Sequence, residues 1–139
     1  MIKKIILIVS MATILVLIII LFINNNTTPI DTSFANSASL KYHYIDKDID
    51  VIITDGEDIN ALKKMFARRT YKDNLSCGFS PDISVTLSNG NQSITFCPAR
   101  DGCPNIQIGD SNMYIRITSE QRNLLNSILG KYGMIFPCI

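Results

Sequence analysis

The longest feature of the hydrophobic pattern is an apolar run close to the N-terminus. Residues 5–23 contain no charged side chain, and Lys3 and Lys4 stand directly before them. A helix of these 19 residues would extend about 28 Å, at a rise of about 1.5 Å per residue, and so nearly match the hydrocarbon core of a bilayer. Residues 1–23 are therefore expected to comprise a cytoplasmic Met-Ile-Lys-Lys and a transmembrane signal anchor, which contacts the lipid bilayer through residues 5–23.

The basic residues around this run indicate its orientation. Two lysines precede it and no basic residue follows until Lys41, so the positive-inside rule places the N-terminus in the cytoplasm and residues 24–139 outside it. Cleavage as a secretory signal peptide is the alternative, because Ala35 and Ala38 stand in small-residue contexts, although the run is longer than an ordinary h-region. We expect a single-pass membrane protein, and a secreted one if the segment is cleaved.

The remainder of the chain has the size of one small domain. Residues 24–39 are rich in Asn, Thr and Ser and predict a polar stalk, after which residues 40–139 form an extracytoplasmic domain. From residue 24 onward the chain carries 11 basic and 12 acidic side chains. This balance argues against nucleic acid as a partner.

Two strands and a helix are predicted at the start of this domain. Residues 40–45 and 50–54 are short segments rich in aromatic and β-branched side chains, with an acidic turn between them. A capping box from Thr54 to Glu57 then opens a helix that should extend to Arg69. Its apolar positions, at helical spacing, are Ile59, Leu62 and Phe66.

The clearest local signal is a hairpin around Asn89-Gly90. Residues 83–88 and 91–96 both alternate apolar and polar side chains, and Asn-Gly between such segments favours a two-residue turn. The resulting register pairs apolar side chains with one another, and it sets two prolines opposite each other where the ladder should stop. The predicted pairs are Val85 with Ile94, Ile83 with Phe96, and Pro81 with Pro98.

A second hairpin is predicted at residues 106–108 and 113–117, across a polar turn. A capping box from Thr118 to Gln121 then opens a final helix, which Gly130 should close. The predicted strand pairs are Ile106 with Ile115 and Ile108 with Met113, and the apolar helix positions are Leu124, Leu125, Ile128 and Leu129. This order of elements predicts an α+β domain, a mainly antiparallel sheet with two helices packed on one face.

Four cysteines in a small exported domain favour two structural disulfides. Structural zinc usually draws cysteine ligands in pairs about two to four residues apart, and thiol-disulfide enzymes use Cys-x-x-Cys, but neither spacing occurs in this sequence. The feet of the first hairpin favour Cys77 with Cys103, which leaves Cys97 with Cys138. The alternative pairing joins Cys77 to Cys97 and Cys103 to Cys138.

Asp46, Asp48 and Asp50 alternate like the start of an EF-hand calcium loop. Val51 stands where that loop needs glycine, and a β-branched residue resists a positive φ, so the calcium loop is rejected. His43, the only histidine, has no recognisable nucleophile or second ligand beside it in the sequence and is predicted to be a surface or packing residue. The sequence thus indicates no catalytic residue, metal site or cofactor site.

Basic residues gather at the end of the first predicted helix and just beyond it: Lys63, Lys64, Arg68, Arg69 and Lys72. They could contact anionic lipid headgroups near the stalk. The favoured alternative is that they complement the negative end of the helix and need no partner.

These features favour a non-enzymatic binding or regulatory module that is anchored outside the cytoplasm and contacts a protein partner near the membrane. The preference rests on the anchor, which confines the domain to a surface, and on the lack of a recognisable catalytic set. The alternative is an anchored or secreted enzyme, a hydrolase or a thiol-disulfide enzyme. Its site would be sought at Asp101-Gly102-Cys103 and in the tail Phe136-Pro137-Cys138.

Overall fold

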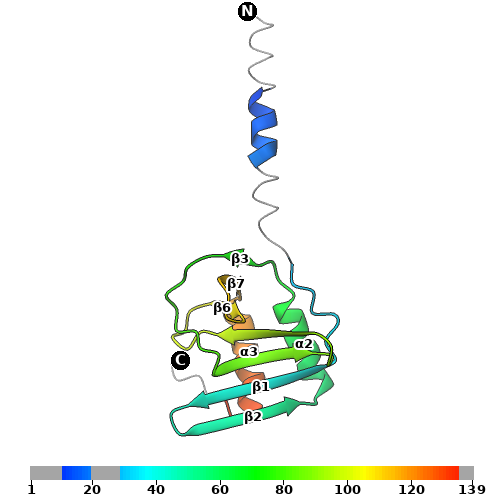
Figure 1. Cartoon of the computed structure of the whole chain (residues 1–139), viewed down its shortest axis with the longest axis vertical. Coiled ribbons are helices and arrows are strands. Elements are labelled where there is room, and N and C mark those ends of the chain that lie inside the picture. Colours follow the sequence, from blue (N-terminus) through cyan, green and yellow to red (C-terminus); the bar gives the residue numbers. More distant parts are fainter. Residues whose placement is uncertain (1–10, 20–28, 135–139) are drawn as a thin grey trace, which may run out of the picture.

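The computed structural model describes residues 11–19 and 29–134 (Figure 1). Residues 11–19 form a helix whose apolar side chains are exposed. Within the described ranges, no helix has both the length and the apolar character that crossing a bilayer requires. Much of the transmembrane segment predicted at residues 5–23 lies outside those ranges.

The domain is built on one seven-stranded sheet in which every pair of neighbours is antiparallel. The strand order is β2-β1-β4-β5-β6-β7-β3, so three hairpins lie side by side and the short β3 forms one edge (Figure 1). The strands are β1 (Ser37–Tyr44), β2 (Lys47–Ile53), β3 (Tyr71–Lys72), β4 (Ile83–Ser88), β5 (Ser93–Pro98), β6 (Asn105–Ile108) and β7 (Met113–Arg116). The predicted α+β class and antiparallel sheet are confirmed, whereas β3 was not expected.

Two helices, α2 (Gly56–Phe66) and α3 (Ser119–Lys131), cover the same face of the sheet (Figure 1). Their apolar residues pack against the inward-facing residues of the strands and form one hydrophobic core with them. Phe66 of α2 lies flat against Phe96 of β5, with 4.1 Å between the ring centroids. The opposite face of the sheet carries no helix among the described residues.

Helix α3 begins where the sequence predicts. Thr118 Oγ1 accepts from the backbone N–H of Gln121 at 3.2 Å, and Gln121 Oε1 accepts from the backbone N–H of Thr118 at 3.0 Å. This reciprocal pair confirms the capping box. The predicted end at Gly130 is wrong, because the helix continues to Lys131 and the positive φ occurs at Gly133.

Helix α2 differs from its prediction at both ends. Asp55, not Thr54, is its N-cap, and Asp55 Oδ1 accepts from the backbone N–H of Glu57 at 2.8 Å. A carboxylate at this position satisfies free N–H groups and faces the positive end of the helix dipole, so it outcompetes the neighbouring threonine. The helix ends at Phe66, three residues before the expected Arg69.

The register of the β4–β5 hairpin is shifted by two residues from the prediction. Val85 pairs with Phe96 rather than with Ile94, and the loop contains four residues, 89–92. Asn89 explains the longer loop, because its side-chain Oδ1 accepts from the backbone N–H groups of residues 91 and 92 at 3.0 and 2.8 Å. A shift by two keeps the same side chains on the core face.

This shift separates the two prolines that were predicted to face each other. The β4–β5 ladder ends at Val85 and Phe96, and Pro98 pairs with Ile106 along the other edge of β5. The next hairpin has the predicted register, since Ile106 pairs with Ile115.

The chain joins the folded domain before residue 40, inside the segment predicted as a stalk. Pro29 forms a β-bridge with Arg69, and the hydroxyl of Thr32 donates to the carbonyl of Lys63 at 2.9 Å. Ala35 is buried in the core. Small and polar residues dominate this segment, so the buried positions leave no hydrophobic pattern in the sequence.

Residues 73–82 connect β3, at the edge of the sheet, to β4 in its middle. A disulfide between Cys77 and Cys103 ties this connection to the segment before β6. The backbone N–H of Arg100 donates to the carbonyl of Gly78 at 3.0 Å and adds a second tie. The disulfide thus holds a long crossing segment that contains no regular secondary structure.

Candidate functional site

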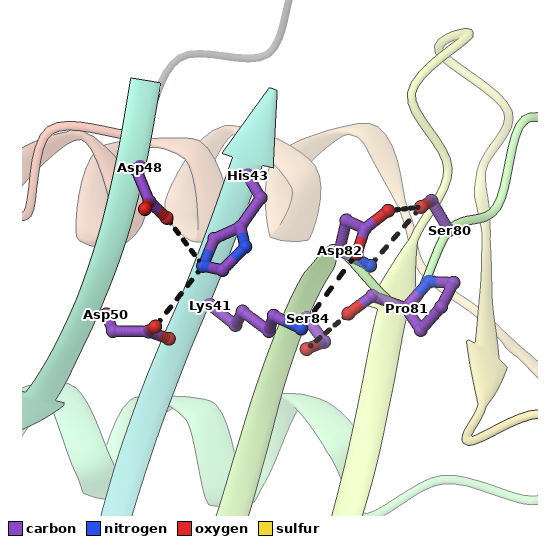
Figure 2. A network of polar contacts seen from close by, with 8 residues as sticks. All are labelled: Lys41, His43, Asp48, Asp50, Ser80, Pro81, Asp82 and Ser84. Carbon is purple, nitrogen blue, oxygen red and sulfur yellow. Dashed lines mark hydrogen bonds and ion pairs between the residues drawn. The ribbon is translucent and has the colours of Figure 1, made fainter. Parts of the chain in front are cut away.

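The open face of the β1–β2 hairpin presents a group of charged side chains (Figure 2). Strand alternation turns Lys41 and His43 of β1 away from the helices, because Leu40 and Tyr42, which alternate with them, belong to the core. The β1–β2 register pairs His43 with Asp48 and Lys41 with Asp50. Four polar side chains from two strands therefore share one small area of surface.

His43 lies between two carboxylates. Its Nε2 atom is 2.7 Å from Asp48 Oδ1 and 3.2 Å from Asp50 Oδ2. A protonated imidazole would pair with both carboxylates, whereas a neutral one could join them as a third ligand to a divalent cation. All three side chains are partly exposed, so solvent screening keeps their contribution to stability small.

The sequence pattern does not indicate that these three residues form a group. In the sequence His43 has no evident partner, and Asp48 and Asp50 belong to the segment whose spacing resembles a calcium loop. Both acids lie in β2, which agrees with that rejection. The length of the turn would have revealed the group. A two-residue turn between the predicted strands sets residue 43 opposite residue 48.

A second part of the network lies beside β4 (Figure 2). Lys41 Nζ is 3.9 Å from Asp82 Oδ1, and the hydroxyl of Ser80 is 3.2 Å from Asp82 Oδ2. The backbone N–H of His43 donates to the carbonyl of Asp82 at 2.8 Å. These contacts support β1 from the turn that precedes β4.

The tip of the β1–β2 hairpin carries an unusual residue. Ile45 has a φ of +57° and its side chain is 87% exposed. A β-branched residue in this left-handed region costs about 1–2 kcal/mol relative to an ordinary conformation. On β2, Ile52 is also exposed, at 69%. The hairpin therefore displays two large apolar side chains beside its charged network, and one of them is held in a strained backbone.

The segment Asp101-Gly102-Cys103, considered above as an alternative enzymatic site, contains one cysteine of the disulfide. Cys103 is bonded to Cys77, and the carboxylate of Asp101 accepts from the backbone N–H groups of Cys103 and Gly78 at 3.1 and 2.9 Å. These hydrogen bonds hold the pKa of Asp101 below its usual range. The adjacent cavity, lined in part by Cys103, encloses about 30 Å³. The tail at residues 136–138 lies outside the described residues.

Cys97 is buried and forms no disulfide with another cysteine among the described residues. Burial, with a smaller effect from the nearby charge of Asp110, raises the pKa of Cys97 to about 11. The thiol is therefore protonated at neutral pH, and only the thiolate is the reactive form. Cys138 lies outside the described residues, so the pairing of Cys97 with Cys138 stays a prediction.

A buried carboxylate joins the two helices. Asp58 of α2 is 4% exposed, and its two oxygens accept from Lys131 Nζ at 2.6 Å and from the hydroxyl of Tyr132 at 3.0 Å. The hydrogen bond from Lys131 lowers the pKa of Asp58, against an opposing effect of burial. The contact thus fixes the start of α2 against the end of α3.

Replacing Asp58 by asparagine is expected to lower the free energy of unfolding at pH 7 by about 1.5 to 3 kcal/mol, because Lys131 loses its charged acceptor while the one amide oxygen of asparagine can still accept from Tyr132. A lowered pKa in the folded state stabilises the protein above the unfolded pKa of about 4, and this stabilisation disappears as the pH falls through the folded value. Urea unfolding of both proteins at pH 7 and pH 3 should therefore show a difference that shrinks at pH 3. An equal difference at both pH values would contradict this account.

Comparisons with protein-family models, with curated proteins and with solved structures give no significant match.

Proposed function

We propose that this chain is a membrane-anchored, extracytoplasmic binding or regulatory module without enzymatic activity, which contacts a protein partner through its β1–β2 hairpin. The anchor in this proposal rests on the uncharged run at residues 5–23. Export is supported by the Cys77–Cys103 disulfide, since disulfides persist in oxidising compartments.

The observation that carries the proposal is the conformation of Ile45. Its exposed side chain gains almost no burial within the chain, and its positive φ lowers the stability of the hairpin. Residues held in costly backbone conformations concentrate at functional sites, where the conformation serves the contact. An apolar side chain displayed at the tip of a hairpin is suited to fill a pocket on a partner, as interface anchors do.

The charged network next to Ile45 supports the same surface. Lys41, His43 and the two aspartates of β2 provide groups of both signs at fixed cross-strand positions. Charges at the rim of an interface contribute mainly to the choice of partner and to the rate of association. The proposed partner therefore has an apolar pocket with polar groups of both signs around it.

Site-specific photo-cross-linking of the full chain in its native membrane tests this proposal. A photoreactive residue in place of Ile52 on the hairpin should give an adduct with one other protein. The matched control is the same residue in place of Leu124, an apolar side chain of α3 that is also exposed, at 47%. An adduct of twice the mass of the chain would replace the proposed partner by a second copy of this protein.

Substitution of Ile45 by glycine separates binding from folding. Glycine adopts a positive φ freely, so we expect the free energy of unfolding to rise by about 1 kcal/mol, after allowance for the greater flexibility of glycine in the unfolded chain. The Ile52 adduct should be lost at the same time. Urea unfolding and the cross-linking yield measure the two effects. Lower stability with an unchanged yield would contradict the role assigned to Ile45.

A further inference from the structure

Four basic side chains line one depression in the surface, at the end of the domain where the chain enters it. They are Lys64, Arg68, Arg69 and Arg116. Lys72 of β3 follows closely in the chain and is exposed. Three of the four lie at the end of the first predicted helix or just beyond it, where cations complement the helix dipole without a partner.

Only one of the four, Lys64, lies in the last turn of α2, where the helix dipole acts. Lys63, which belongs to the last turn of α2, turns away and donates to the carbonyls of Ser33 and Ala35 at 3.1 and 2.7 Å. Arg116 comes from β7, which the β3–β7 pairing brings beside the end of α2. The end of the helix dipole carries about half a negative charge, which is too little to balance four cations, so a net positive charge remains around the depression.

None of the four lining cations is neutralised within the part of the chain that the structure describes. The ion pairs there involve only Lys41, His43 and Lys131 as cations. Four like charges around one depression repel one another, and an anion placed among them would relieve this repulsion. The depression therefore favours an anionic ligand.

The position of the depression suggests where the anion comes from. Arg69 pairs with Pro29 in a β-bridge, and the carbonyl of Arg68 accepts from the backbone N–H of Ile30 at 3.0 Å. Only residues 24–28 separate Pro29 from the end of the predicted anchor, and the six Cα–Cα steps from residue 23 to Pro29 can extend at most about 22 Å. The anchor therefore confines these arginines to the neighbourhood of the headgroups.

We propose that this basic depression binds anionic phospholipid headgroups of the membrane in which the chain is anchored. The domain then docks with its β3 edge toward the bilayer, and β2, at the opposite edge of the sheet, faces away (Figure 1). Each basic residue near an anionic surface is worth about five-fold in affinity. The inference rests on the proposed function, because it requires the anchor, and it gives the β1–β2 hairpin an orientation suited to a partner.

Hydrogen–deuterium exchange of the full chain in lipid nanodiscs tests the inference. Nanodiscs of phosphatidylcholine alone are compared with nanodiscs that contain about 30% phosphatidylglycerol, a fraction chosen to supply several anionic headgroups per domain. We expect phosphatidylglycerol to slow exchange at residues 64–72 and 113–117, and high salt to remove this protection. Exchange at residues 43–52, on the β1–β2 hairpin, should not change.

Paired variants identify the side chains responsible. Arg69→Gln with Arg116→Gln removes two exposed cations of the depression, so docking should weaken by roughly 30-fold and the protection should disappear. The control, Lys47→Gln with Arg100→Gln, removes the same charge from residues that do not line the depression, and the protection should persist. Thermal unfolding checks that both pairs fold. Protection that persists in the depression variant, or that is lost equally in the control, would overturn the inference.

The outcomes also separate this inference from the function on which it rests. A chain that does not remain with phosphatidylcholine nanodiscs would refute the anchor and the lipid docking together. A chain that remains but shows no dependence on phosphatidylglycerol would refute the docking alone. Equal protection by free inorganic phosphate would make the depression a site for a soluble anion and would also overturn the proposed lipid contact.

Discussion

Replacing Phe66 by alanine should lower the free energy of unfolding by about 3 to 5 kcal/mol. Phe66 is fully buried and its ring stacks on Phe96, so it joins α2 to the middle of the sheet. Domains of this size are typically stable by about 5–15 kcal/mol, so the substitution should remove a large part of the total. Urea unfolding measures the change.

Leu124→Ala is the control for this substitution, because Leu124 is a large apolar residue that is nearly half exposed. We expect its effect to be well below that of Phe66→Ala, since little apolar surface is returned to water. Equal losses of unfolding free energy at the two positions would contradict the role of Phe66 in joining α2 to the sheet.

Loss of the Cys77–Cys103 disulfide should have an effect of similar size. The bridge closes a loop with a sequence separation of 26 residues, for which the chain-entropy relation gives about 3.5 kcal/mol. The connection between β3 and β4 depends on this bridge, because it has no regular secondary structure of its own. We expect the double variant Cys77→Ser with Cys103→Ser to unfold at a markedly lower urea concentration than the wild type.

Reductant supplies the internal control for the disulfide. It should lower the stability of the wild-type protein to that of the reduced double variant, and any loss of stability that it causes in the double variant measures the predicted Cys97–Cys138 bridge. If the variant were as stable as the oxidised wild type, the bridge would have no structural role. If reductant weakened the variant as well, another disulfide would have to contribute.

Local signals in the sequence predicted the elements of the fold better than their ends. The hairpins and both helices follow from alternation, helical spacing and capping residues, all of which act between neighbours in the chain. Asn89-Gly90 marked the right turn but the wrong loop length, because the Asn89 side chain builds a four-residue loop that a dipeptide signal does not specify. Thr54 and Asp55 are adjacent and both are suitable N-cap residues, so the sequence did not decide between them, and the structure has Asp55.

The candidate sites depend on contacts between distant segments, which local patterns do not encode. Arg116 reaches the basic depression only because β3, a strand of two residues, pairs with β7. The strain at Ile45 is a property of the turn and has no signature in composition. The group around His43 is the exception, since the register of one short hairpin would have revealed it.

The cross-linking yield at Ile52, relative to the yield at Leu124, tests the central claim most directly. If the β1–β2 hairpin is the binding surface of an extracytoplasmic module, the probe at Ile52 should capture one partner protein in the native membrane. The probe at Leu124 should not capture it, and Ile45→Gly should abolish the Ile52 adduct without loss of stability. Equal capture at both positions, or an adduct unaffected by Ile45→Gly, would contradict the account.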